Sequence, residues 1–93
     1  MKIKVTKDFD KKFFKQLSYI YDDKPRAAHK FKIDVFKEIK NLTLMPYKHR
    51  QSIYYVDNNI RDLIFKGYVI TYRVRVELDQ IEIFGLTKYT EKP

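Results

Sequence analysis

Residues 60–76 read IRDLIFKGYVITYRVRV, and this stretch decides the fold. β-Branched and aromatic residues dominate both sides of Lys66-Gly67, which predicts two strands, 60–66 and 68–76, joined by a two-residue turn. A turn of that length fixes which residues face each other across the hairpin. It pairs Phe65 with Tyr68, Leu63 with Ile70 and Arg61 with Tyr72.

A third strand is predicted at 81–86, after the polar segment 77–80. If that segment forms a four-residue loop, Val76 lies opposite Ile81 and the two strands pair antiparallel. One face of the resulting sheet is strongly apolar, and we expect the helices to cover it. The other face carries Ile60, Asp62, Ile64, Val69, Thr71, Arg73, Arg75, Glu82, Phe84 and Leu86.

This second face is half apolar and half charged. Arg75 lies opposite Glu82 in the predicted register and Asp62 lies diagonal to Arg73, so each pair is expected to add a few tenths of a kcal/mol to about 1 kcal/mol. A face left in water seldom carries so many apolar side chains. The pattern therefore suggests that a partner binds there.

Helical periodicity precedes these strands. The alternation at 2–5 predicts a short strand, after which Thr6 or Asp8 offers an N-cap. Two apolar stripes at helical spacing follow, and the segment 22–25, which ends in Pro25, separates them. The first stripe is Phe9, Phe13, Leu17 and Ile20, widened by Phe14 and Tyr21; the second is Ala28, Phe31, Val35, Ile39 and Leu42, broadened by Ile33 and Phe36.

The segment 43–59 is irregular, with 52–56 as a possible short extended piece. The predicted order is therefore strand, helix, helix and three strands. An α+β fold satisfies it, with the N-terminal strand and a helical hairpin packed on one face of a three-stranded antiparallel meander. The length of 93 residues predicts a single domain, 1–93.

Composition limits the chemistry. The chain has no cysteine, which excludes disulfides and thiolate metal sites, and we expect neither a metal nor another cofactor. No apolar run is long enough to span a membrane, so a cytoplasmic protein is expected. The net charge of +8 lies entirely within residues 1–50. That excess predicts an acidic partner, either nucleic acid or an acidic protein segment, unless it is only a solvated helical surface.

Four residues are candidates for metal-independent RNA cleavage, which needs a base, an acid and a positive group at the phosphate. Arg73 would supply the positive charge, unless it only pairs with a neighbouring carboxylate. His49 titrates near neutrality and would serve as acid or base, although a plain surface histidine explains it as well. Lys88 and Tyr89 would be a phosphate ligand and a base, or would simply end the last strand.

Three further residues have structural interpretations. Arg61 falls beside Tyr72 on the face turned toward the helices, which predicts a buried or semi-buried ion pair. The pair Tyr54-Tyr55 either stacks on nucleic-acid bases or packs against the helical hairpin.

The segments 60–74 and 81–86 (IEIFGL), together with the element order, resemble the RelE/ParE family, the toxins of bacterial type II toxin–antitoxin pairs. The resemblance covers nearly the whole chain and is strongest over 61–86. It implies a small basic toxin that a cognate antitoxin holds inactive. RelE-like members are ribosome-dependent mRNA endonucleases, whereas ParE-like members poison DNA gyrase.

The resemblance is closer to the ParE-like members. The nuclease pattern expects an arginine directly after Tyr68, where this chain has Val69, and Arg61-Asp62-Leu63 is similar to ParE-like chains. The leading hypothesis is a gyrase-directed toxin that is not itself an enzyme. A RelE-like endonuclease acting on the ribosome and its mRNA, and a non-toxic antitoxin-binding module, are the alternatives. The expected antitoxin contacts on the second face are Ile64, Val69, Arg73, Phe84 and Leu86.

Overall fold

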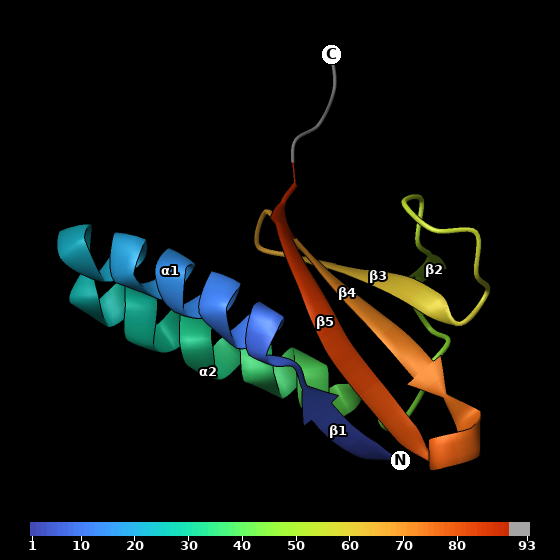
Figure 1. The fold of residues 1–93 in the computed structure, drawn as a ribbon. Coiled ribbons are helices and arrows are strands. Elements are labelled where there is room, and N and C mark those ends of the chain that lie inside the picture. The colour runs from blue at the N-terminus through green and yellow to red at the C-terminus, as the bar shows by residue number, and fades with distance from the viewer. Residues whose placement is uncertain (90–93) are drawn as a thin grey trace.

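The computed structural model describes residues 1–89 and has two helices beside a five-stranded sheet (Figure 1). The sheet order is β1-β5-β4-β3-β2, in which β1 runs parallel to β5 and the other neighbours are antiparallel. The elements are β1 (Lys2–Val5), α1 (Lys7–Asp23), α2 (Pro25–Asn41), β2 (Arg50–Gln51), β3 (Ile60–Phe65), β4 (Tyr68–Arg75), a 3₁₀ turn η1 (Val76–Leu78) and β5 (Gln80–Lys88). This arrangement confirms the predicted α+β fold. The short strand β2, in the segment predicted to be irregular, was not predicted.

The helices form the expected antiparallel hairpin and extend beyond the sheet (Figure 1). Thr6 caps α1, because its hydroxyl oxygen accepts a hydrogen bond of 3.1 Å from the Phe9 N–H. Pro25 opens α2 after the single linking residue Lys24.

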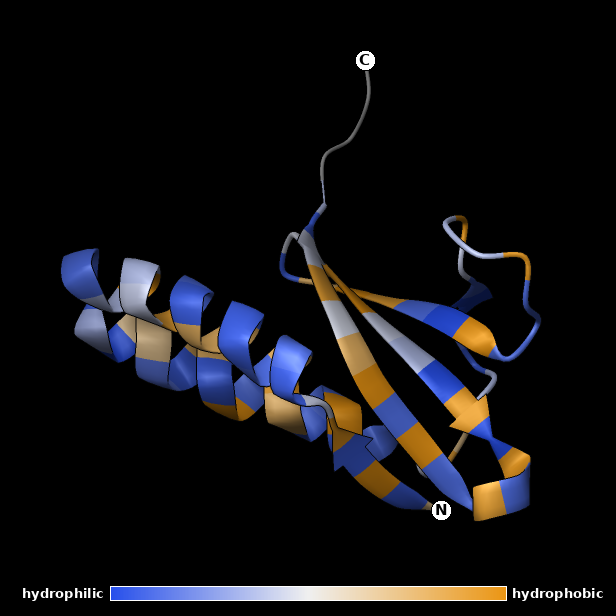
Figure 2. Cartoon of the chain, viewed as in Figure 1, coloured by the Kyte–Doolittle hydropathy of each residue, from blue (hydrophilic) through white to orange (hydrophobic). Residues whose placement is uncertain are grey.

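The predicted apolar stripes do form the core between the hairpin and the sheet (Figure 2). Phe9, Phe13, Phe31, Val35, Ile39 and Leu42 share one buried cluster with Leu63, Ile70, Tyr72, Val74, Ile81, Ile83 and Leu86. The expected broadening of the stripes was partly wrong. Phe36 packs against this core, but Phe14, Tyr21 and Ile33 are exposed.

The β3–β4 hairpin has the predicted register, with Phe65 opposite Tyr68. Lys66 and Gly67 both have positive φ, 50° and 83°, as a type I′ turn requires, and this turn is common in two-residue hairpin loops. Local turn chemistry was therefore enough to fix this half of the sheet.

The predicted β4–β5 register was wrong by two residues. Val76 leaves the strand and enters η1, and Asp79 adopts the left-handed conformation with φ 50°. The closing pair is consequently Arg75 with Gln80, so Val74 lies opposite Ile81.

A β-bulge at Phe84 corrects the face assignment of the last strand. Tyr72 lies opposite Ile83 but Thr71 lies opposite Gly85, which leaves Phe84 as the extra residue. Because one inserted residue reverses the alternation of side chains, Leu86 lies in the core rather than on the second face, where it was predicted.

Candidate functional site

The second sheet face is partly covered by the loop between β2 and β3. The predicted extended piece at 52–56 is not a strand; the strand β2 lies just before it. The Ser52 N–H donates to the Ile60 carbonyl oxygen at 2.8 Å, and the Ile53 N–H donates to Asp62 Oδ2 at 3.3 Å. These bonds hold the loop against β3, so this face is less open than the sequence predicted.

Asp62 anchors that loop from beneath. Its side chain is 0% exposed and accepts hydrogen bonds from the Thr71 hydroxyl at 3.2 Å and from Arg50 Nη2 at 3.5 Å. Arg50, on β2, is therefore the charge partner of Asp62, and the predicted pairing with Arg73 was wrong. The carboxylate lies under the loop and ties β2, β4 and the loop to β3.

An aromatic and ionic cluster occupies the middle of the same face. The Arg73 guanidinium lies 5.5 Å from the centre of the Phe84 ring and 3.7 Å from Glu82 Oε1. Tyr55 packs edge-on against Phe84, with ring centres 5.7 Å apart, rather than against the helical hairpin. The shifted register explains why Arg73, and not Arg75, lies opposite Glu82.

The four nuclease candidates do not converge. Arg73 is on the second face, beside Glu82, whereas His49 packs edge-on against the core residue Tyr72 at 6.3 Å between ring centres. Lys88 lies opposite Tyr68, five residues along β4 from Arg73, which is roughly 17 Å at the rise of an antiparallel strand. The Tyr89 N–H bonds to the Gly67 carbonyl oxygen at 2.7 Å, at the same remote end.

His49 and Tyr72 form a separate group near the start of β3, and Tyr72 belongs to the core on the side of the helices. Burial, followed by the charge of Lys48, holds the pKa of His49 below its ordinary value. Burial also raises the pKa of Tyr72 to about 12, and its hydroxyl donates to the Pro46 carbonyl oxygen at 2.6 Å. The neutral forms of both side chains are thus favoured at neutral pH.

Arg61 is held by carbonyl oxygens, not by the predicted ion pair. It donates to the Asn58 carbonyl oxygen at 2.9 Å, to Asn58 Oδ1 at 2.9 Å and to the His49 carbonyl oxygen at 3.1 Å. Its guanidinium also lies 5.0 Å from the centre of the Tyr47 ring. These contacts give Arg61 a structural role in fixing the two loops around β3.

The expected antitoxin contacts differ in how much surface they offer. Ile64 is 42% exposed and Phe84 and Arg73 are half-buried, so these three side chains are accessible. Val69 is 0% exposed and Leu86 is 8% exposed. A partner on this face would therefore meet the first three rather than the last two.

Two hollows flank the second half of β5. The first, of about 310 Å³, is lined by Lys12, Lys15, Gln16, Tyr68, Leu86, Thr87 and Lys88. The second, of about 300 Å³, is lined by Asp8, Lys12, Tyr54, Tyr55, Thr71, Phe84, Gly85 and Thr87. We call them the lysine hollow and the aromatic hollow. Lys12 and Lys15 are three residues apart on α1 and so share one helix face, a sequence signal that was not among the predicted site residues.

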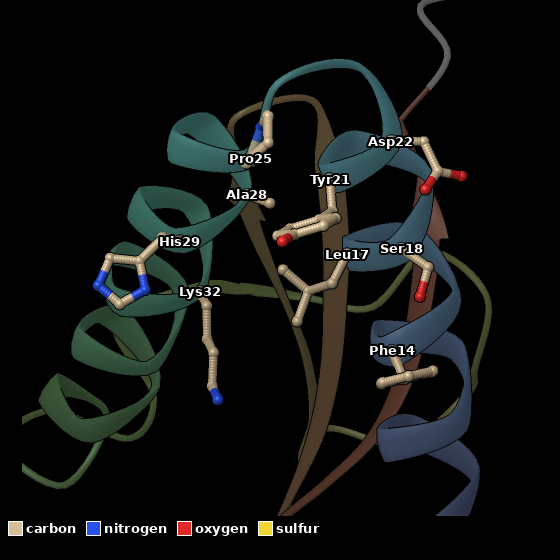
Figure 3. A pocket seen from close by; sticks show the side chains of 9 residues that line it. All are labelled: Phe14, Leu17, Ser18, Tyr21, Asp22, Pro25, Ala28, His29 and Lys32. Carbon is tan, nitrogen blue, oxygen red and sulfur yellow. The ribbon is translucent and has the colours of Figure 1, made fainter.

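A third hollow, of about 430 Å³, lies between the helices near their connection (Figure 3). Leu17 and Tyr21 point from α1 toward α2, while His29 and Lys32 line the opposite side. Phe14 and Tyr21, which the sequence had assigned to the core stripe, line this groove instead.

Within residues 1–89, no helix is long and apolar enough to cross a membrane. Over the same range, no three histidine or acidic side chains gather as a metal site would require.

Comparison with known families places the chain. The family model described as "ParE toxin of type II toxin-antitoxin system, parDE" matches residues 3–88, which covers every helix and strand of the structure except the first residue of β1. No curated protein matches the chain. A ParE-type toxin implies an antitoxin partner. The chain belongs to the ParE toxin family of type II toxin–antitoxin systems.

Proposed function

We propose that this toxin inhibits growth by binding DNA gyrase in the cytoplasm, without itself being an enzyme, and that a cognate acidic antitoxin neutralises it. Family membership supports the choice of target, since the family match is to ParE rather than to the nuclease branch. The observation that carries the proposal is the separation of the residues that RNA cleavage would need.

Nuclease chemistry requires its charged and proton-transferring groups around one phosphate. Here the position that the nuclease pattern gives to arginine is Val69, which is 0% exposed. Arg73 has Glu82 as an ion-pair partner and packs on Phe84, so its charge is partly neutralised. Loss of one preorganised contact to the transition state typically costs about 10²–10³ in rate.

The charge distribution supports an acidic antitoxin. The excess of +8 lies within residues 1–50, which include both helices of the hairpin. An acidic partner would therefore be steered toward this side, and salt would slow its association. A salt-independent association rate would contradict this part of the proposal.

The test compares two activities of the purified toxin. We expect inhibition of DNA supercoiling by gyrase and no cleavage of mRNA, with or without ribosomes. Arg73→Ala is the informative variant, because a relocated catalytic charge would make RNA cleavage depend on it. If the parent cuts mRNA and this variant does not, the gyrase proposal fails; if neither activity appears once the antitoxin is removed, the non-toxic alternative replaces it.

A further inference from the structure

The outer edge of β5 is paired along only half of its length. β1 pairs with β5 from Gln80 to Ile83, and the Thr6 N–H then donates to the Ile83 carbonyl oxygen at 3.0 Å. Thr6 caps α1, so the chain turns away at this point while β5 continues to Lys88 (Figure 1). Within residues 1–89, no strand pairs with this side of 84–88.

An unpaired strand edge presents alternating backbone N–H and C=O groups to any extended chain that comes alongside. Five residues of β5 are free in this way, which is roughly 17 Å of strand. That length matches a partner segment of about five residues. Phosphates offer no N–H donors, so a peptide backbone complements this edge better than a nucleic-acid strand does.

The two hollows lie on opposite sides of this free edge. Leu86 and Lys88, which line the lysine hollow, lie opposite Ile70 and Tyr68 in the register, on the side of the helices. Phe84 and Gly85, which line the aromatic hollow, lie on the second face, where Tyr55 contacts Phe84. Lys12 and Thr87 line both hollows, which places the edge of β5 between them.

The side chains of an added strand would alternate between these hollows, because successive residues of a strand point to opposite faces. The lysine hollow is cationic: Lys12 is paired with Asp8 at 3.1 Å, but within residues 1–89 no ion pair holds Lys15 or Lys88. The aromatic hollow offers the rings of Tyr54, Tyr55 and Phe84.

We propose that 84–88 of β5 is the docking edge for an extended segment of the antitoxin in which acidic residues alternate with apolar ones. The acidic side chains enter the lysine hollow, the apolar side chains enter the aromatic hollow, and the backbone extends the sheet beyond the end of β1. This inference rests on the proposed toxin–antitoxin function and adds the place and the sequence pattern of the contact.

The test uses a fluorescent nine-residue peptide in which Glu alternates with Val and Leu, with binding to the full chain followed by anisotropy. A control peptide of the same composition carries its Glu residues in one block. We expect the alternating peptide to bind at least about tenfold more tightly than the control peptide, and its affinity to fall as the salt concentration rises. Equal binding of the two peptides would overturn the proposal.

Two pairs of variants separate the hollows from general charge and hydrophobicity. Lys15→Glu is expected to weaken binding about tenfold, whereas Lys11→Glu, on the same helix but outside both hollows, makes the same charge change and is expected to have little effect. In the same way, Phe84→Ala is expected to weaken binding, whereas Tyr19→Ala is expected to have little effect, because Tyr19 is an exposed aromatic residue of α1 that lines neither hollow.

Backbone pairing has its own test in peptide N-methylation. Methyl groups on alternate residues remove every second N–H, so one methylated set should abolish binding and the complementary set should leave it intact. Identical effects of the two sets, or preferential binding of an oligothymidine to the same edge, would overturn the proposal. If the toxin inhibits gyrase but the alternating peptide does not bind, only this inference fails. If the peptide binds but the toxin does not inhibit gyrase, only the proposed target fails.

Discussion

Replacement of the buried Asp62 tests how the second face is held together. In Asp62→Ala, the Thr71 hydroxyl and the Ile53 N–H both lose their acceptor, and the Arg50 guanidinium loses its charge partner. The carboxylate is 0% exposed, and the Thr71 hydroxyl that it accepts from is buried with it. The structure therefore predicts a large destabilisation from a side chain outside the main hydrophobic core.

The expected size follows from these three contacts. Leaving a buried donor without a partner costs about 1–3 kcal/mol, which applies in full to the Thr71 hydroxyl and only in part to the Ile53 N–H, because that hydrogen bond is part-buried. The Arg50 side chain is 40% exposed, and its contact of 3.5 Å is long, so that pair adds at most about 1 kcal/mol. We therefore expect Asp62→Ala to lower the free energy of unfolding by about 3 kcal/mol, or the melting temperature by roughly 12–24 °C.

Urea unfolding followed by circular dichroism measures the free energy, and hydrogen exchange of the Ile53 amide reports on the loop. Arg50→Ala serves as the control, since it removes the ion pair while both hydrogen bonds to Asp62 remain. We expect it to cost less than Asp62→Ala, because the carboxylate keeps both of these hydrogen-bond donors and the contact it loses is long, at 3.5 Å. The reasoning is refuted if Asp62→Ala unfolds within 1 kcal/mol of the parent, and the ion pair dominates if both variants lose equal stability.

Four further predictions concern stability. Phe13→Ala should cost about 3–5 kcal/mol in urea unfolding, because it opens a cavity in the core. Gly67→Ala should cost about 1–2 kcal/mol, since its φ of 83° penalises any Cβ although the space around it is open; unchanged stability would contradict this. The depressed pKa of His49 means that the unfolded chain takes up a proton more readily, so stability should fall as pH drops below about 6.5, and His49→Gln should abolish that slope. The pKa of Tyr72, raised to about 12, gives stability that is complete below about pH 10 and is lost as pH rises toward 12, an alkaline loss that Tyr72→Phe should remove.

The parts of the fold that were predictable from sequence depend on neighbours within one turn or one helical period. Lys66-Gly67 fixed the β3–β4 register because a two-residue loop allows only one alignment of its flanks. The apolar stripe that begins at Phe9 identified the buried face of α1, because residues at helical spacing lie on one side of a helix. Membership of the toxin family also followed from such patterns, because the segment over 60–86 carried the resemblance.

The β4–β5 register depends on features that no local pattern specifies. Val76 has high strand propensity but enters η1, and Asp79 takes the left-handed conformation that closes the turn. Phe84 then supplies the bulge, which reverses the alternation and moves Leu86 into the core. An alternating apolar strand reads the same in either register, so the choice was made by packing against the helices.

The candidate nuclease residues show a second limit of sequence reasoning. Arg73, His49 and Lys88 each have a side chain suited to the chemistry, but residue type does not reveal which face or which end of a strand a side chain occupies. Their separation became visible only with the sheet topology. The loop at 52–56 likewise covers a face that the alternation of β3 and β4 alone would leave open.

The free edge of β5, by contrast, has a cause that is readable in the sequence. Thr6 ends β1 after four residues because its hydroxyl caps α1, whereas β5 continues for nine residues. A parallel partner that must turn into a helix cannot follow the longer strand to its end. In this chain the early cap and the long final strand therefore leave unpaired backbone of β5 beside α1, and the lysines of α1 favour an acidic complement.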